Sequence, residues 1–129
     1  KPSKYLFSSP AFRSMYYKMV GSSISEENAR GRLLEDLVGM YLFRLVHQKV
    51  ITSLTYDSAQ GGADFILGTG KEKLVIEVGV NKQGFKQVFK TGEKVGSRYN
   101  VVISERSDGI ELDMDSNSVR IPLRIFLLV

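Results

Sequence analysis

Residues 74–104 read LVIEVGVNKQGFKQVFKTGEKVGSRYNVVIS, and they predict a strand, a helix and a second strand in that order. The first strand covers residues 74–78, and apolar residues at helical spacing mark a helix over residues 83–95. Residues 99–104 are apolar almost without alternation, which is typical of a strand covered on both faces. Because a strand, a helix and a strand in succession form a right-handed parallel crossover, the fold class is α/β with a mixed sheet. The helix is expected to turn inward Phe85, Val88, Phe89 and Val95.

Two more strands precede this unit. β-branched residues predict a strand over residues 50–56, and Gly61-Gly62 separates it from a strand over residues 63–67. A turn at residues 68–72 then closes a hairpin onto the strand at residues 74–78.

Two helices open the chain, and short elements close it. The first helix is predicted over residues 11–20, behind Pro10. After a break at residues 21–23, Ser23 or Ser25 caps a long helix that runs to about residue 48. After the strand at residues 99–104, we expect short edge strands at residues 110–114 and 119–121 and an apolar tail at residues 122–129.

The composition predicts one globular domain over residues 1–129. The 129 residues are 43% apolar and 25% charged, which is enough apolar surface for one core. Cysteine is absent and His47 is the single histidine, so disulfides, zinc ribbons, thiol nucleophiles and iron–sulfur sites are excluded. A metal would have to be a hard cation held by carboxylate oxygens. We expect His47 at the boundary of the core or inside it.

The net charge of +4 permits an acidic partner such as DNA but falls short of the basic density of a dedicated nucleic-acid binder. No stretch reaches the ~18 apolar residues that a membrane span needs, and residues 1–5 lack the apolar region of a signal peptide. We therefore expect a soluble, cytoplasmic protein with no membrane segment. Because the sequence starts at Lys1 rather than methionine, we also expect a fragment of a longer protein.

Two carboxylates interrupt the predicted hairpin. If Gly68 pairs with Lys73 across the turn, Asp64 stands opposite Glu77 on one face, with Cβ atoms roughly 5 Å apart. Such a pair repels, and relief comes from a shared divalent cation, a basic neighbour or protonation of one acid. A shift of one residue in register would separate the two side chains. The basic neighbours available to Glu77 are Lys71, Lys73 and Lys82.

Glu35 is a candidate third acid on the long helix. It lies at the border of the apolar stripe, in line with Gly31 and Gly39 one turn away on either side. On the same helical wheel, Asp36 points to solvent. The alternative is that Glu35 is an ordinary acid at the edge of the core.

Basic residues recur every four positions along the predicted helix at residues 83–95. Such a stripe follows a phosphate backbone or forms a solvated face opposite the apolar side chains. Its members are Lys82, Lys86, Lys90, Lys94 and Arg98.

Two other patterns fail. Gly68-Thr69-Gly70-Lys71 is similar to part of a phosphate-binding loop, but Glu72 follows where the loop requires Ser or Thr, so ATP binding is not encoded here. The serines have no positioned base, which argues against a Ser-His-Asp site.

Three short motifs together resemble the PD-(D/E)XK nuclease superfamily. They are GRLLEDLV at residues 31–38, GADFIL at residues 62–67 and VIEV at residues 75–78. More narrowly, the sequence is similar to the domain at the C-terminus of archaeal and bacterial AAA+-type ATPases. That likeness extends to residues 4–11 and to Ile121-Pro122-Leu123, and it covers nearly the whole chain.

The resemblance implies a restriction-endonuclease-like αβββαβ core with a magnesium site. Asp64 and Glu77 would bind Mg²⁺ and Glu35 would assist. The superfamily's lysine, two positions after the Glu, is replaced by Gly79. Lys82 either reaches back to serve in its place or is a surface lysine at the start of the helix. The resemblance also makes Gln87 a lesser candidate for contact with the metal site or with nucleic acid.

Three functions remain open. The first is the C-terminal nuclease-like domain of an AAA+-type ATPase, a Mg²⁺-dependent DNA phosphodiesterase whose activity the glycine at position 79 reduces or abolishes; ATP hydrolysis would belong to the rest of the chain. The second is a non-catalytic module that binds nucleic acid or protein and targets or assembles the ATPase. The third is homo-oligomerisation through the apolar residues 125–129.

Overall fold

The computed structural model describes residues 4–21 and 23–128. Residues 1–3, Ser22 of the predicted break and Val129 of the predicted tail lie outside the described residues. The elements follow the expected order, with an additional short helix at the end, and Ser25 is the N-cap of the long helix. The elements are α1 (Pro10–Val20), α2 (Glu26–His47), β1 (Ser53–Thr55), β2 (Phe65–Gly68), β3 (Lys73–Gly79), α3 (Lys86–Val95), β4 (Tyr99–Ser104), β5 (Glu111–Asp113), β6 (Ser118–Pro122) and α4 (Leu123–Phe126).

The strands form one open sheet in the order β1-β2-β3-β4-β6-β5. β3 pairs in parallel with β4, and β4 in parallel with β6, whereas the other neighbours are antiparallel. The predicted α/β class with a mixed sheet is confirmed, and α3 connects the two parallel strands β3 and β4. The predicted hairpin register is also confirmed, because Gly68 pairs with Lys73.

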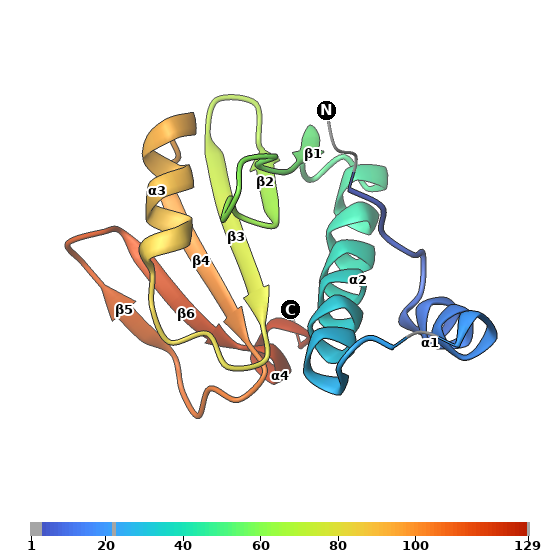
Figure 1. The fold of residues 1–129 in the computed structure, drawn as a ribbon. Helices are drawn as coiled ribbons and strands as arrows, with labels where there is room; N and C mark the ends of the chain where they lie inside the picture. Colours follow the sequence, from blue (N-terminus) through green and yellow to red (C-terminus); the bar gives the residue numbers. More distant parts are fainter. Residues whose placement is uncertain (1–3, 22, 129) are drawn as a thin grey trace.

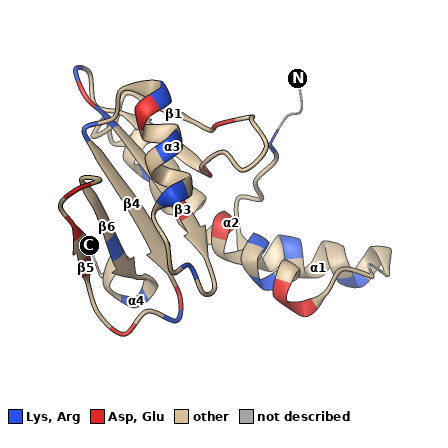
Figure 2. Cartoon of the chain, turned by 60° about the vertical axis from the view of Figure 1, so that its left-hand side comes forward, with Lys and Arg blue, Asp and Glu red and all other residues tan. Residues whose placement is uncertain are grey.

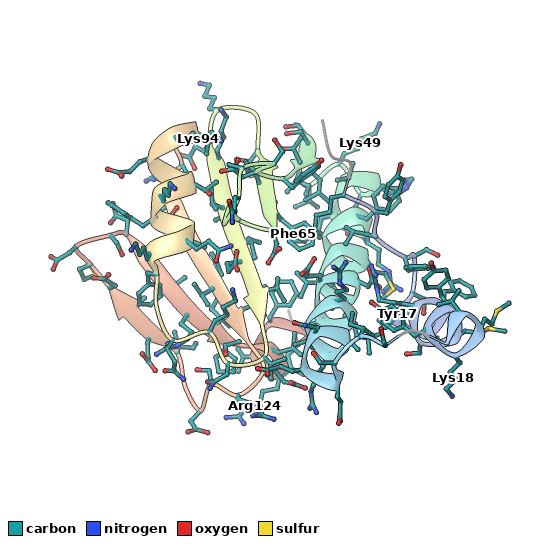
Figure 3. The ribbon with its side chains drawn as sticks, in the orientation of Figure 1. Tyr17, Lys18, Lys49, Phe65, Lys94 and Arg124 are labelled. Atoms are coloured by element: carbon teal, nitrogen blue, oxygen red, sulfur yellow. The ribbon has the colours of Figure 1, made fainter. Side chains whose placement is uncertain are left out.

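α2 and α3 pack on opposite faces of the sheet (Figure 1). Alternate residues of a strand point to opposite faces, so Ile76 joins the core under α2 while Val75 packs with Val88 of α3. Phe65 of β2 lies between the sheet and α2 (Figure 3). By the same alternation, Glu77 faces the side of the sheet that α3 covers.

α1 lies on the outer side of α2, away from the sheet (Figure 1). Arg13 and Asp36 join the two helices, and both are buried, at 7% and 0% exposed. The Asp36 carboxylate accepts hydrogen bonds from Nε and Nη2 of Arg13 and from the backbone N–H of Phe7. The prediction that Asp36 points to solvent is wrong, because the wheel of α2 alone does not include a second helix packed on that side.

The strand predicted over residues 50–56 is shorter than expected. β1 covers Ser53–Thr55, while the backbone N–H of Val50 donates to the carbonyl of Leu45 at 2.9 Å. Lys49 adopts a left-handed φ of 59°. These residues therefore satisfy the carbonyl groups at the end of α2, which a helix cannot satisfy internally.

β6 is an inner strand, so its prediction as an edge strand is wrong. It lies between β4 and β5, and β5 is at the edge. Its polar residues Ser118 and Arg120 are buried, at 3% and 6% exposed. They are tolerated there because Ser118 donates to the carbonyl of Ser116 and Arg120 pairs with Glu111. The short length and the polar residues of β6 therefore do not make it an edge strand.

Two aromatic positions also differ from expectation. Phe89 was predicted to face inward but is 38% exposed, because the buried side of α3 is limited to Val88, Thr91 and Gly92. His47 is the last residue of α2 and is exposed. Its ring contacts the ring of Phe43 edge-on at 4.7 Å between centroids, so it is not a core histidine.

The predicted apolar tail packs on its own domain. Leu123 is buried, and Phe126 and Leu127 contact the core under α2. Leu128 is 85% exposed. Within the segment that suggested oligomerisation, Ile125, Phe126 and Leu127 are thus partly buried on their own domain. Across residues 4–21 and 23–128, no helix is long and apolar enough to cross a membrane.

Candidate functional site

A cleft of about 790 Å³ opens where β3 ends, between the first half of α2 and the start of α3. The structure brings together there five of the side chains that the sequence singled out, from different segments of the chain: Glu35, Asp64, Glu77, Lys82 and Gln87. A lysine from the segment before α1 joins them. The polar side chains used below are Lys4, Glu35, Asp64, Glu77, Lys82 and Gln87.

Asp64 and Glu77 occupy the predicted cross-strand positions. Phe65 pairs with Ile76, so Asp64, one residue before β2, stands opposite Glu77. Oδ2 of Asp64 accepts a hydrogen bond from the backbone N–H of Val78 at 2.9 Å. This bond and the register place the Asp64 carboxylate beside Glu77.

Glu77 is a buried carboxylate with incomplete hydrogen bonding. It is 3% exposed, and its Oε1 accepts a hydrogen bond from Nζ of Lys82 at 2.5 Å. Among the described residues, its Oε2 has no hydrogen-bond partner. Burial, and then the negative charge of Asp64, raise the pKa of Glu77 to about 7. The site therefore contains a buried oxygen that a cation would satisfy.

Lys82 reaches Glu77 by lying across Gly79. A Cβ at position 79 would stand 2.7 Å from Cγ and from Cε of Lys82, so a side chain at this position would displace the lysine. Two buried residues fix the backbone of Lys82. Ser104 accepts a hydrogen bond from its N–H at 3.3 Å, and Arg120 donates to its carbonyl at 3.1 Å. The backbone of Lys82 is therefore fixed, and its side chain, which is 38% exposed, pairs with Glu77.

Glu35 enters the cleft from α2 and meets a residue that the sequence reasoning missed. Nζ of Lys4 lies 3.0 Å from Oε2 of Glu35 and 2.7 Å from Oδ1 of Asp64. Burial, and then the charge of Asp64, raise the pKa of Glu35. Burial acts to lower the pKa of Lys4, but Asp64 and then Glu35 outweigh it, and the pKa is raised overall. Lys4 precedes the predicted elements, so no periodicity pointed to it; its place in the family-like opening stretch was the one available signal.

Gln87 lines the cleft, whereas the three lysines of α3 do not. Nε2 of Gln87 donates to the carbonyl of Gly62 at 2.9 Å, and its Oε1 lies 3.5 Å from Nζ of Lys82. Figure 2 shows Lys and Arg segments in blue along α3. Lys94 bonds to Asp57 at 2.6 Å. Lys86 and Lys90 are exposed on this helix.

The donor set suits magnesium better than softer metals. Nowhere in residues 4–21 and 23–128 do three or more His, Cys, Asp or Glu residues form a group that could hold a metal ion. Mg²⁺ commonly binds through one or two carboxylates and keeps its other ligands as water or phosphate. Asp64 and Glu77 supply two hard carboxylates, and Oε2 of Glu77 has no other partner within the described chain. The residues therefore fit Mg²⁺.

Comparisons with known proteins identify a longer relative. No family model matches this chain, and no solved structure matches it. The chain is similar to Uncharacterized protein MJ1637 of Methanocaldococcus jannaschii, with 38% identity over 121 residues, which is 93% of this chain. The alignment covers 24% of that protein, so the chain spans about a quarter of its relative's length.

Proposed function

We propose that the cleft is the site of a Mg²⁺-dependent DNA phosphodiesterase and that the domain is a nuclease-like domain with a restriction-endonuclease-like αβββαβ core. The observation that carries this proposal is the pairing of Lys82 with Glu77 at 2.5 Å across Gly79, while Oε2 of Glu77 is buried without a partner among the described residues. The resemblance to the PD-(D/E)XK superfamily supports it.

Asp64 and Glu77 would hold the magnesium ion. When bound, Mg²⁺ would supply a water of lowered pKa and positive charge beside the scissile phosphate. The protein fixes the two carboxylates by the hairpin register and by the hydrogen bond from Val78 to Asp64. Such preorganised groups need no rearrangement during the reaction.

Lys82 would stabilise negative charge as it develops on the phosphate. Its ammonium lies in the cleft, and Ser104 and Arg120 fix its backbone. Gly79 contributes by leaving room for this side chain. On this proposal, glycine at the position of the superfamily's lysine is an accommodation to Lys82.

Binding of Mn²⁺ or Mg²⁺ to the purified chain tests the first step. We expect calorimetry to detect binding, and Glu77→Gln to weaken it by more than about 100-fold, since changes to outer-shell partners alone cost about 10–100-fold. The matched control is Glu93→Gln, which changes an exposed glutamate of α3 and should leave binding intact. Equal affinities for the wild type and the Glu77→Gln variant would exclude this site.

Cleavage of linear and branched DNA tests the second step. The double variant Asp64→Ala with Glu77→Ala should abolish cleavage while its circular dichroism spectrum stays that of a folded protein. Metal-dependent cleavage that persists in the folded double variant would reject the assignment of these two residues.

A specific observation favours the non-catalytic module as a second candidate. The two lysines already bond to all three carboxylates, Lys4 to Asp64 and Glu35, and Lys82 to Glu77. In this case the exposed Lys86 and Lys90 would contact DNA, and affinity would fall as salt rises because neutralised phosphates release counterions. DNA binding that survives the double carboxylate substitution, without any cleavage, would identify this function. Loss of binding in Lys86→Glu with Lys90→Glu would locate the surface.

The proposed attachment to an AAA+-type ATPase rests on the resemblance and on the greater length of the relative. We expect a longer protein that contains this domain to hydrolyse ATP. Deletion of this domain should abolish DNA targeting but leave ATP hydrolysis unchanged. A longer protein without ATPase activity would reject the attachment.

A further inference from the structure

Lys4, in the segment before α1, places a positive charge among the carboxylates of the cleft. Its ammonium lies between Asp64, at 2.7 Å, and Glu35, at 3.0 Å, and 5.0 Å from the centre of the Phe65 ring. Its backbone N–H donates to the hydroxyl of Tyr56 at 3.2 Å. The Lys4 side chain is 21% exposed. Lys4 therefore occupies two of the three carboxylates in the way that a bound cation would.

Asp64 and Glu35 have structural support besides Lys4. The backbone N–H of Val78 and the hairpin register position Asp64, and the backbone of Glu35 belongs to α2. The backbone that carries both carboxylates is therefore fixed by contacts other than Lys4.

The segment that carries Lys4 is attached to two separate places. Lys4 contacts the cleft, whereas the next residues contact the α1–α2 pair: Arg13 donates to the carbonyl of Tyr5 at 3.4 Å, and the backbone N–H of Phe7 donates to buried Asp36 at 2.9 Å. Between Lys4 and Phe7, Tyr5 is 82% exposed and Leu6 is 37% exposed. Lys4 can therefore leave the cleft while Phe7 and α1 stay docked on α2.

We propose that residues 4–7 form a strap that a divalent cation displaces: Lys4 pairs with Asp64 and Glu35 in the resting protein, and metal binding at Asp64 and Glu77 releases it. This inference rests on the proposed metal site. Its physical basis is that both oxygens of Asp64 already accept hydrogen bonds, Oδ1 from Lys4 and Oδ2 from the backbone N–H of Val78, so a metal at Asp64 would compete with Lys4 for Oδ1 and the two positive charges would repel each other. Lys82 need not leave, because it bonds to Oε1 of Glu77 while Oε2 has no partner among the described residues. Metal binding and strap docking then oppose each other.

Mn²⁺ titration of the whole chain by calorimetry tests the competition. Lys4→Met keeps most of the side-chain volume and removes the charge, and it should tighten Mn²⁺ binding by about tenfold or more, a difference of about 1.4 kcal/mol per tenfold. Lys18→Met, which changes an exposed lysine of α1, is the matched control and should leave the affinity unchanged (Figure 3). Lys4→Arg keeps the charge and should not tighten binding. Adding Glu77→Gln to Lys4→Met should abolish the gain.

Tryptic cleavage after Lys4 gives a second readout, independent of affinity. Trypsin must take the lysine side chain into its own specificity pocket, so docking of Lys4 in the cleft protects the bond to Tyr5. Mn²⁺ should accelerate cleavage at this bond in the wild type but not in Glu77→Gln. Cleavage after Lys18 serves as the internal control and should not change.

The outcomes separate the strap from the metal site. If Mn²⁺ binds the wild type and Lys4→Met with equal affinity, or binds Lys4→Met more weakly, the strap is overturned and the metal site stands. If Mn²⁺ binds but does not accelerate cleavage after Lys4, the strap is likewise overturned. If Mn²⁺ binds neither protein, the proposed metal site fails and the strap fails with it.

Discussion

This molecule contains two groups of paired acidic and basic side chains, which differ in how fully the carboxylate oxygens are hydrogen-bonded. In the contact between α1 and α2, Arg13 and Phe7 donate to both oxygens of Asp36, which is 0% exposed. In the cleft, three carboxylates share two lysines, and Oε2 of Glu77 has no partner among the described residues. The first group is balanced and closed, whereas the second divides two ammonium groups among three carboxylates and opens to solvent.

The difference separates a structural role from a capacity to bind. Arginine is suited to the closed pair because its planar guanidinium donates two hydrogen bonds to one carboxylate. Lysine is suited to the cleft because a single ammonium on a flexible stem can leave a carboxylate without disturbing the backbone. A ligand cannot enter the first group unless α1 separates from α2, whereas the second group lines an open cleft.

Breaking the closed pair should have the largest effect on stability. Arg13→Ala leaves the Asp36 carboxylate buried without its guanidinium, so the free energy of unfolding should fall by about 3–5 kcal/mol. Urea unfolding monitored by circular dichroism measures this loss.

Glu77→Gln is the comparison variant for this prediction, because it removes a buried charge from the open group. Burial and Asp64 already raise the pKa of Glu77 to about 7, so the neutral side chain should leave the stability at pH 7 unchanged or higher. If Glu77→Gln destabilises the protein as much as Arg13→Ala, the distinction between the two groups is wrong.

Gly79→Ala tests the role of the Lys82–Glu77 pair in the cleft. The added Cβ would overlap Lys82 at 2.7 Å, so the lysine must leave Glu77 while the strand stays paired. We expect DNA cleavage to fall by about 10–100-fold, less than the roughly 10²–10³-fold loss when an oxyanion donor is removed outright. The rate constant for cleavage under saturating Mg²⁺ measures the effect.

Gly84→Ala is the matched control, since a Cβ at position 84 would meet no atom within 4 Å. It should cleave DNA at the wild-type rate. Wild-type cleavage by Gly79→Ala would remove Lys82 from the proposed mechanism.

The sequence predicted those parts of the site that depend on local pattern. The hairpin register placed Asp64 opposite Glu77, because the pairing of Gly68 with Lys73 fixes the positions that follow it. The order of β3, α3 and β4 followed from changes in period. These features involve neighbouring segments of chain, for which periodicity is informative.

The parts that were missed depend on contacts between distant segments. Lys4 contacts Asp64, which is 60 residues away in the sequence, and neither residue type nor spacing predicts such a contact. Asp36 was placed in solvent because a helical wheel distinguishes one core-facing side and takes no account of a helix packed outside it. The burial of Arg120 in β6 likewise depends on partners in the loop after β3 and in β5.

Asp57 provides the smallest and last test, because it lies between the two kinds of group. Its side chain is 5% exposed, and it pairs with Lys94, whose side chain is 58% exposed. The hydrogen bond from Lys94, then that from the backbone of Ala59, hold the pKa of Asp57 below its usual value of 3.8. Ionised Asp57 therefore adds stability above pH 3.8, and this contribution is lost as the pH falls through the lower value in the folded protein. Asp57→Asn should cost about 1 kcal/mol at pH 7, and the difference from wild type in urea unfolding should shrink towards pH 3. A difference that stays constant between pH 7 and pH 3 would show that the charge of Asp57 does not contribute, and that its oxygens act as acceptors alone.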